Sequence, residues 1–354
     1  MTSKLNIAIV GATGVVGSIM RELLAAEREK WGEIRLIASP RSAGKVLNVG
    51  DEEITVQAMS PEVFEGIDIA HFDLPDEVSA EWVPVAAEKG AIVIDKSAHF
   101  RMEDDVPLVA PEANPEDVRN RPRNIIANAN CTTLTLIPSI APLHREFGLA
   151  SMSVASYQAA SGGGKAGLEA LYEQVNKTTP ADGLGTKPGD VREALGEEAN
   201  EAFGAPLAWN VVPKVGGWRD GGWTSEELKV RNESRKMLGH PTLKVASTCV
   251  RVPVAIGHAQ AVHATFENDV TVEQARAVLE KAEGVTVVDD PGNNVYPTSI
   301  DSAGISGTQV GRLRQSVDFP NSLEFFTVGD NLIKGAAENS MQVAELLRKE
   351  LTES

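Results

Sequence analysis

The segment "NANCTTLT" at residues 128–135 contains Cys131, one of only two cysteines in the 354-residue chain. Asn130 precedes it and is a favoured N-cap residue, which predicts that the sulfur lies in the first turn of a helix. There the helix dipole lowers the pKa of a thiol and increases the fraction of thiolate, the nucleophilic form. Pro138 argues against one unbroken helix beyond that turn. A buried cysteine that only fills space is the ordinary alternative.

His258, in "RVPVAIGHAQ", is a candidate acid/base because imidazole exchanges protons near neutral pH. A histidine in a strand is equally common as a core residue. Cys249 lies inside an alternating strand and shares a face with Arg251, but its mid-strand position argues against a nucleophile. The other histidines show no metal-ligand spacing, so we expect no metal ion.

A glycine-rich stretch near the N-terminus, "IAIVGATGVVG", places Gly11, Gly14 and Gly17 after an expected strand and at the start of an expected helix. Glycines here let the backbone approach a pyrophosphate, and the helix N-terminus offers N–H groups and a positive dipole end. The stretch therefore predicts a dinucleotide-binding loop. A glycine-rich turn without a ligand is the alternative.

The segment "ASPRSAGK" at residues 38–45, which ends the second expected strand, indicates which dinucleotide is bound. An acidic residue here would hold the ribose 2′-hydroxyl of NAD. The segment has no acidic residue and instead contains Arg41 and Lys45 beside hydroxyl groups. Because a guanidinium binds a 2′-phosphate with two hydrogen bonds, this pattern favours NADP over NAD. An ordinary basic surface loop is the alternative.

A thiolate beside a nicotinamide predicts one chemistry above others. The sulfur attacks an aldehyde, the adduct passes hydride to NADP⁺, and a thioester remains on the cysteine.

Short apolar runs alternate with helical segments in the first third of the chain. This alternation predicts a parallel sheet covered on both faces, a Rossmann-type doubly wound α/β fold. The expected strands are residues 5–11, 34–39, 54–59, 67–74, 91–97 and 124–129, with helices at 18–31 and 76–90.

From about residue 150 the strands become longer and alternate in polarity, as at 151–161 and in 244–266, which Pro253 interrupts. Alternation indicates a sheet with two unlike faces, so we expect an antiparallel or mixed sheet in an α+β part. Residues 177–223 are rich in Gly, Pro and acidic residues and predict an excursion with a short acidic helix.

This change in the pattern of expected strands indicates two domains. Residues 1–130 form the expected NADP-binding domain, completed by a C-terminal helix at 330–354. Residues 131–329 form the expected second domain, with the catalytic and substrate-binding residues.

The formal net charge of −17 argues against nucleic acid or an anionic membrane as a partner. Two cysteines form no disulfide framework and suggest a reducing compartment. The start of the chain does not read as a signal peptide, and no apolar run approaches the roughly 18 residues of a membrane span. We therefore expect a cytoplasmic protein.

Eight motifs occur along the chain: "GATGVVG", "ASPRSAGK", "SAHFRM", "NANCTT", "YQAASGGG", "TSEELK", "RVPVAIGH" and "GDNLIKGAAENS". Their order is the one found in aspartate-β-semialdehyde dehydrogenases, and the chain resembles this family over nearly its whole length. The resemblance implies reversible conversion of L-aspartate 4-semialdehyde, phosphate and NADP⁺ into L-4-aspartyl phosphate and NADPH. In cells this reaction feeds lysine (through diaminopimelate), threonine, methionine and isoleucine biosynthesis. The resemblance also implies a homodimer formed through the second domain.

The same resemblance implies a role for individual residues. Cys131 becomes the acyl-thioester nucleophile and His258 the acid/base. Gln158 orients the substrate, Arg251 binds its carboxylate and Glu226 binds its ammonium. The implied phosphate-binding residues are Arg101, Asn130 and Lys229. The implied cofactor-binding residues are Gly11, Thr13, Gly14, Val15, Val16, Gly17, Arg41, Ser42, Ser161, Gly162 and Asn331.

Charge considerations agree with these roles. An amino-acid substrate needs one cation and one anion, and an attacking phosphate needs further cations. Glu226 and Lys229 fall three residues apart on one face of the helix expected at 225–238. An exposed ion pair of little energetic value is the ordinary interpretation of that pair.

Other functions fit part of this pattern. An N-acetyl-γ-glutamyl-phosphate reductase shares the fold and the Cys/His chemistry, but its substrate has no free ammonium to pair with Glu226. The motifs do not match a phosphorylating glyceraldehyde-3-phosphate dehydrogenase. A non-catalytic NADP-binding sensor would not need Cys131, Gln158, Arg251 and His258 together. The sequence therefore favours the aspartate-semialdehyde reaction.

Overall fold

The computed structural model describes residues 4–180 and 182–353, which divide into two compact units. The first unit contains the chain up to Asn130, together with Arg235–His240 and the chain from Ile333 onward. The second unit contains Cys131–Ser234 and Pro241–Leu332. In the described part of the chain, no helix has both the length and the apolar character that a membrane span requires.

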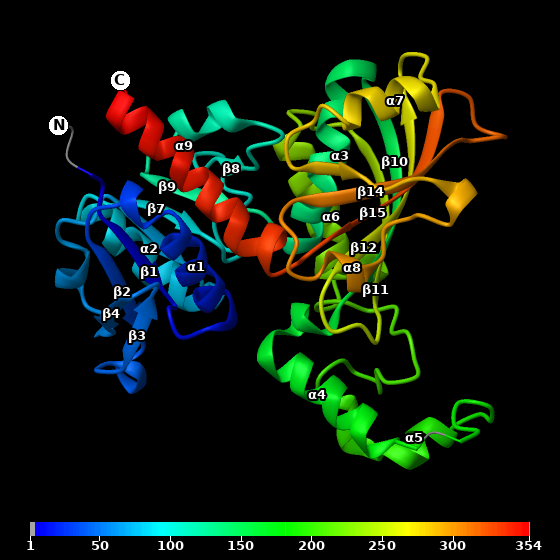
Figure 1. Ribbon diagram of the computed structural model, residues 1–354, viewed down its shortest axis with the longest axis horizontal. Coiled ribbons are helices and arrows are strands. Elements are labelled where there is room, and N and C mark those ends of the chain that lie inside the picture. Colours follow the sequence, from blue (N-terminus) through cyan, green and yellow to red (C-terminus); the bar gives the residue numbers. More distant parts are fainter. Residues whose placement is uncertain (1–3, 181, 354) are drawn as a thin grey trace. The chain divides into compact units, whose positions relative to one another are not determined.

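A seven-stranded parallel sheet forms the centre of the first unit, with strand order β5-β2-β1-β6-β7-β9-β8 (Figure 1). This confirms the doubly wound α/β fold. The chain runs outward from β1 to β2 and β5 and then returns to β6 on the other side of β1, so the strand order reverses between β1 and β6. The strands are β1 (Ile7–Val10), β2 (Ile34–Ala38), β5 (Gln57–Ala58), β6 (Ile69–Phe72), β7 (Ile92–Asp95), β8 (Leu108–Val109) and β9 (Ile125–Asn128).

The single strand expected at residues 54–59 is two elements in the structure. Only β5 joins the large sheet, whereas β4 (Glu52–Thr55) pairs with β3 (Val46–Val49) in a separate antiparallel hairpin. Gly50, at φ +59°, occupies the turn between them, a conformation that glycine adopts without strain.

Helices α1 (Val15–Ala26), α2 (Asp76–Glu88) and α9 (Asn339–Glu353) belong to the first unit. The expected C-terminal helix is wound as a π-helix over Ile333–Glu338 before α9 begins. Within that π-helix the fully buried Lys334 donates from Nζ to Glu112 at 2.6 Å and to Gln342 at 2.8 Å. Apolar side chains of α1 and α9 pack with those of the sheet in one core, including Ile9, Leu36, Ile69, Met20, Leu24, Met341 and Leu347.

A mixed six-stranded sheet forms the second unit, with strand order β11-β10-β12-β15-β14-β13 (Figure 1). Its strands are β10 (Leu149–Gln158), β11 (Lys244–Arg251), β12 (His258–Phe266), β13 (Val285–Val287), β14 (Thr308–Gln315) and β15 (Ser322–Gly329). Its principal helices are α3 (Cys131–Phe147), α4 (Gly164–Lys177), α5 (Asp190–Leu195), α6 (Ser225–Met237), α7 (Val272–Leu279) and α8 (Ser299–Ser302), with the last turn of α6 belonging to the first unit.

Helix α3 runs without a break through Pro138 and Pro142, so the expectation of an interruption at Pro138 was wrong. The helix packs on β10, β12, β14 and β15, and every residue from Thr132 to Leu143 is buried. The burial of this apolar surface outweighs the hydrogen bond lost at each proline, because helices in proteins are stabilised mainly by packing.

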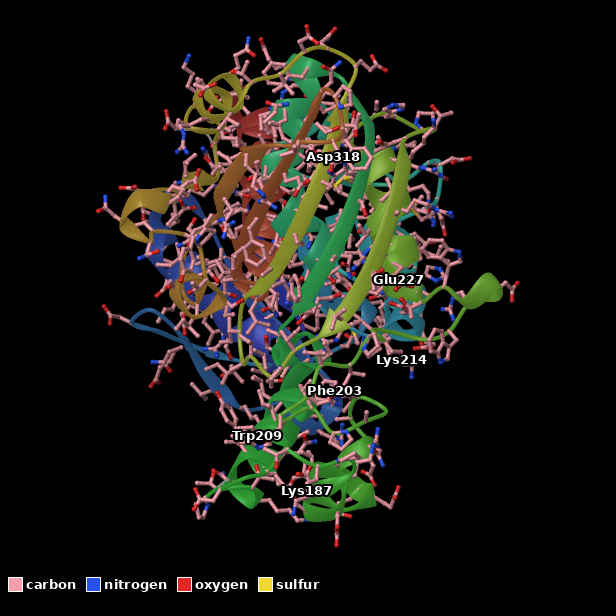
Figure 2. The ribbon with its side chains drawn as sticks, turned by 90° about the vertical axis from the view of Figure 1, so that its right-hand side faces the viewer. Lys187, Phe203, Trp209, Lys214, Glu227 and Asp318 are labelled. Carbon is pink, nitrogen blue, oxygen red and sulfur yellow. The ribbon has the colours of Figure 1, made fainter. Side chains whose placement is uncertain are left out.

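Helix α4 leads from β10 into the excursion expected at residues 177–223, which contains the short acidic helix α5. Both lie beyond one end of the second unit's sheet (Figure 1). Figure 2 shows Lys187, Phe203 and Trp209 on this segment and Asp318 at the opposite end of the unit. Gln174 holds the segment together, because its Nε2 donates to Ala199 O and its Oε1 accepts from the N–H groups of Leu207 and Ala208.

His71 of β6 is a buried polar residue on a hydrophobic sheet face. It lies between Ile9 and Ile94 in the strand register, and its Nε2 has no hydrogen-bond partner among the described residues. Burial lowers the pKa of this imidazole to about 3.

We expect His71 to destabilise the fold as the pH falls below its ordinary pKa of 6.5. His71 then becomes protonated in the unfolded chain but stays neutral in the folded protein, so acidification favours unfolding. The loss should reach about 2 kcal/mol between pH 7 and pH 5, and His71→Leu should lack it. Urea unfolding of both proteins at pH 7 and pH 5 measures the difference. Parallel pH dependence of the two proteins would contradict the assignment.

Candidate active site

Cys131 is the first residue of α3 and His258 is the first residue of β12. The structure brings them together, with 3.4 Å between the cysteine Sγ and the histidine Nε2. The sulfur is partly accessible, whereas the imidazole is fully buried. A helix N-terminus and a histidine within contact distance are the environment that favours a reactive thiolate.

The backbone of Ala159 determines which nitrogen of the His258 ring carries the proton. Its N–H donates to Nδ1 at 3.0 Å, so the neutral ring carries its proton on Nε2, facing the sulfur. Burial, and after it the positive charge of Arg251, hold the pKa of His258 well below its ordinary value of 6.5. At neutral pH the ring is therefore an uncharged hydrogen-bond donor toward Sγ.

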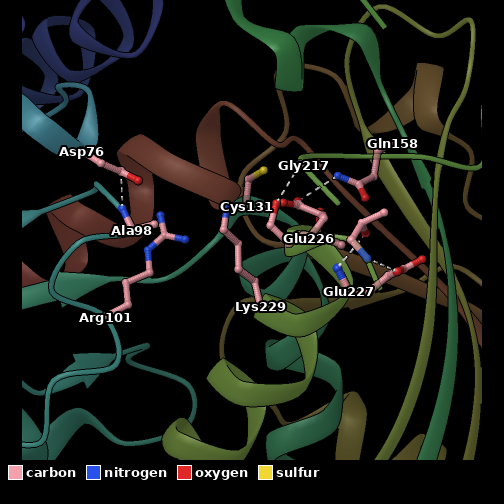
Figure 3. A network of polar contacts seen from close by, with 12 residues as sticks. Asp76, Ala98, Arg101, Cys131, Gln158, Gly217, Glu226, Glu227 and Lys229 are labelled. Carbon is pink, nitrogen blue, oxygen red and sulfur yellow. Dashed lines mark hydrogen bonds and ion pairs between the residues drawn. The ribbon is translucent and has the colours of Figure 1, made fainter. Parts of the chain in front are cut away.

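Gln158 and Glu226 form a buried polar pair next to Cys131 (Figure 3). Gln158, the last residue of β10, donates from Nε2 to Glu226 Oε1 at 3.1 Å, and its own Oε1 accepts from Ser156 Oγ at 2.9 Å. Thr132 Oγ1 also donates to Glu226 Oε1, at 3.2 Å. These contacts hold the Glu226 carboxylate in the first turn of α6, with Oε1 toward Gln158 and Thr132.

Lys229, one turn further along α6, lies with Nζ 3.6 Å from Glu226 Oε2. Its side chain is 32% exposed and that of Glu226 only 7%. The two residues therefore differ from an ordinary surface pair, because the anion is buried and the cation reaches solvent.

Arg251, the last residue of β11, is a buried cation with hydrogen-bonding capacity to spare. Its Nη1 donates to Ala159 O at 2.6 Å, and its guanidinium lies 5.5 Å from the ring centroid of Phe203. Its Nε has no partner among the described residues. Burial lowers the pKa of the guanidinium from its ordinary value, while Cys131 and Glu226 raise it. A ligand carboxylate would satisfy this charge and its unused N–H groups.

Gly162 leaves room for this site. A Cβ at this position would lie 2.6 Å from Arg251 Nη1 and 3.1 Å from the His258 ring, so a larger residue would displace both. Ser161 and Asn331 lie beside it, with 2.9 Å between Asn331 Nδ2 and Ser161 Oγ. Asn331 Oδ1 accepts from the N–H of Gly257 at 2.9 Å. The residues expected to bind cofactor in the second unit are thus gathered near His258.

The glycine loop lies in the first unit, between β1 and α1. A Cβ on Gly11, at φ +97°, would lie 2.4 Å from Asp73 O, and one on Gly17 would lie 2.4 Å from Gly11 O. Gly14 is the N-cap residue of α1 and provides no side-chain cap, and Thr13 and Val15 are exposed. This backbone cradle fits a pyrophosphate bound by N–H groups at a helix start. The side chain of Val16 is buried in the core, so only its backbone faces a ligand there.

The other expected site residues of the first unit also take defined positions. Arg41 and Ser42 lie in a short helical turn, Pro40–Ser42, directly after β2, with Arg41 exposed. Asn130 and Arg101 are buried, and Arg101 Nη2 donates to Lys96 O at 2.6 Å. Near Arg101, the Ala98 N–H donates to Asp76 Oδ1 at 2.8 Å (Figure 3).

Four contributors to the site were not predicted from the sequence. They are the Ala159 backbone, Ser156 behind Gln158, Thr132 beside Glu226 and Phe203 beneath Arg251. Thr132 stands next to the cysteine and Ser156 two residues before Gln158, so both were within reach of a sequence argument. Phe203 lies in the excursion, whose sequence gives no periodic signal. The Ala159 contact uses backbone atoms, so no residue type in the sequence indicates it.

Comparison with known proteins places both units in one enzyme class. The family model "Semialdehyde dehydrogenase, NAD binding domain" matches residues 6–121, and "Semialdehyde dehydrogenase, dimerisation domain" matches residues 140–334. Together they cover most of the chain and define a semialdehyde dehydrogenase, an oxidoreductase with an NAD(P)-binding domain.

Individual relatives show which family of semialdehyde dehydrogenases the chain resembles. The chain is 44% identical to the aspartate-semialdehyde dehydrogenase of Corynebacterium melassecola, covering 97% of this chain and 99% of that one. It is 38% identical to the Bacillus subtilis enzyme, with 99% of each chain covered. A crystal structure of aspartate semialdehyde dehydrogenase II from Vibrio cholerae complexed with ASA superposes with a TM-score of 0.89, at 36% identity over 99% of each chain. The chain belongs to the aspartate-semialdehyde dehydrogenase family.

The two cysteines should react at very different rates with an alkylating agent. Cys131 is accessible, begins a helix and contacts His258, whereas burial raises the pKa of Cys249 to about 12. We expect N-ethylmaleimide to label Cys131 at least a hundredfold faster at pH 7, because both thiolate fraction and access favour it. Peptide mass spectrometry over time measures the ratio, with Cys131→Ser as control. Similar slow labelling at both positions would contradict an activated nucleophile.

Proposed function

We propose that the protein catalyses the reversible NADPH-dependent reductive dephosphorylation of L-4-aspartyl phosphate to L-aspartate 4-semialdehyde. This step serves lysine, threonine, methionine and isoleucine biosynthesis. The observation that carries the proposal is the 3.4 Å contact between Cys131 Sγ and His258 Nε2 at a helix start, with a buried cation and a buried anion in the same unit. The Vibrio cholerae relative complexed with ASA supports the substrate.

In the direction of oxidation, Cys131 Sγ attacks the aldehyde carbon and forms a C–S bond, and the carbonyl oxygen becomes an alkoxide. His258 acts as acid/base by sharing its Nε2 proton with that oxygen. When bound, NADP⁺ would supply the hydride acceptor for this carbon, and loss of the hydride would leave a thioester on Cys131. Phosphate oxygen then attacks the thioester, and the C–S bond breaks to give the acyl phosphate and return the thiolate.

The two charged ends of the substrate are matched by Arg251 and Glu226. Arg251 binds the carboxylate through N–H groups that its contact with Ala159 leaves unused. Glu226 binds the ammonium, and Gln158, fixed between Glu226 and Ser156, orients the reacting carbon. A substrate acylated on nitrogen has no ammonium for Glu226 to bind, which disfavours N-acetyl-γ-glutamyl phosphate.

NADP is the proposed cofactor. Arg41 and Ser42 follow β2, at the position where this fold contacts the ribose 2′ group of the dinucleotide. Residues 38–45 contain no acidic side chain that would select a free 2′-hydroxyl. The glycine loop from Gly11 to Gly17 would hold the pyrophosphate, and Ser161, Gly162 and Asn331 would contact the nicotinamide half.

Phosphate binding falls to Arg101, Asn130 and Lys229, which supply two cations and an amide. A homodimer is the proposed assembly, because the family model over residues 140–334 describes a dimerisation domain. We further propose a cytoplasmic location, in keeping with two free cysteines and the acidic composition.

An absorbance assay for NADPH tests the proposed reaction. With L-aspartate 4-semialdehyde and NADP⁺, we expect NADPH to form only when phosphate is present and to disappear in Cys131→Ser. Parallel reactions with NAD⁺ measure cofactor preference. Turnover of N-acetylglutamate semialdehyde instead would move the protein to the reductase reaction, and binding of NADP⁺ without any turnover would support a sensor.

Arg251→Lys tests carboxylate recognition separately from charge. Lysine keeps the positive charge near His258 but lacks the planar fork that contacts Ala159 and a carboxylate together. We expect kcat/KM for the semialdehyde to fall more than tenfold, a loss of at least about 1.4 kcal/mol in transition-state stabilisation. The KM for NADP⁺, measured in the same assay, should stay within twofold. Normal kinetics would remove Arg251 from the substrate site.

A further inference from the structure

Asp73 and Lys96 form an ion pair that has no role in the function described above. Asp73 directly follows β6 and Lys96 directly follows β7, the next strand of the same sheet. The Lys96 ammonium lies 2.9 Å from Asp73 Oδ1, and about a quarter of each side chain is exposed.

The pair stands where the strand order of the sheet reverses. The Asp73 N–H donates to Val10 O and the Lys96 N–H to Phe72 O, so each residue extends the ladder at the carboxyl end of its strand. Open α/β sheets bind their ligands in the crevice at this end, beside the reversal between β1 and β6. Both side chains therefore flank the crevice rather than the opposite edge of the sheet.

The Asp73 carboxylate also borders the glycine loop itself. Its Oδ2 lies 3.7 Å from the position that a Cβ on Gly14 would take. Its backbone oxygen lies 2.4 Å from the position that a Cβ on Gly11 would take. A carboxylate this close to a bound pyrophosphate would repel it unless a cation intervened. Lys96 is the cation in contact with it.

We propose that Asp73 and Lys96 are dinucleotide-contacting residues of the first unit. The Lys96 ammonium donates to the pyrophosphate, and the Asp73 carboxylate accepts hydrogen bonds from ribose hydroxyls on the nicotinamide side. That side follows from the sheet, because Arg41 after β2 marks the adenosine half and β6 and β7 lie across β1 from it. The inference rests on the proposed cofactor and adds two residues to its site.

Lys96→Met tests the ammonium contact, with Lys89→Met as the matched control. Lys89 also pairs with a carboxylate, at 2.8 Å from Glu65, but it precedes β7 and so lies at the opposite edge of the sheet. By isothermal titration calorimetry, we expect Lys96→Met to raise the Kd for NADP⁺ at least tenfold, because a phosphate contact is lost and Asp73 is left unneutralised. Lys89→Met should change it less than twofold.

The Asp73→Asn background separates these two causes. There Lys96→Met should raise the Kd for NADP⁺ no more than about threefold, because the repulsive carboxylate is gone. Adenosine 2′-monophosphate lacks the pyrophosphate and the nicotinamide ribose, and its Kd should be the same for the wild type and Lys96→Met. Equal melting temperatures of the variants would show that the fold is intact, and Lys96→Gln provides a second, polar replacement.

The outcomes distinguish this inference from the proposed cofactor. Unchanged NADP⁺ affinity in Lys96→Met, or an equal loss for adenosine 2′-monophosphate, would overturn the inference while the cofactor assignment stands. Binding of NAD⁺ but not NADP⁺ by the wild type would overturn the cofactor assignment, and the same series would then be measured with NAD⁺, which has the same pyrophosphate and ribose. Binding of neither dinucleotide would overturn both.

Discussion

The backbone of Ala159 is the constraint on which the site of the second unit depends. Its N–H fixes the tautomer of His258, and its carbonyl accepts from Arg251. One residue thus sets the proton position of the candidate acid/base and the orientation of the candidate carboxylate-binding cation. Because both contacts use backbone atoms, their geometry depends on the turn after β10 and not on the side chain at this position. Gly162 in the same turn keeps the space that the two side chains require.

The register of the sheet explains why these residues meet. Gln158 ends β10 opposite Arg251, which ends the parallel strand β11, and antiparallel β12 begins with His258 at the same edge. Three neighbouring strands therefore deliver an amide, a guanidinium and an imidazole to one edge of the sheet. Helix α3, packed on the sheet through its buried length, begins there with Cys131. A shift of one residue in any strand would turn its functional side chain to the other face.

Local sequence signals predicted the parts of the fold and site that depend on short-range physics. The glycine loop after β1 and the position of Cys131 at a helix start were predicted because turn and capping preferences act within a few residues. The continuation of α3 through Pro138 was not, since it depends on burial against strands far along the chain. The Ala159 contact to His258 spans 99 residues and involves a backbone group, so no residue pattern encodes it. Phe203 reaches Arg251 from an excursion without periodicity.

The distribution of charge explains how a chain of net charge −17 can recognise anions. Near Cys131 the imidazole is kept neutral by burial and by Arg251, so the guanidinium is the principal positive charge beside the sulfur. Burying such a cation is costly, and the cost is offset only when an anion and further hydrogen bonds satisfy it. Its backbone contact and the Phe203 ring hold the guanidinium in place without neutralising it. A ligand carboxylate in contact with the guanidinium would add to the negative charge that Glu226 already contributes, so such a ligand would stabilise the buried cation further.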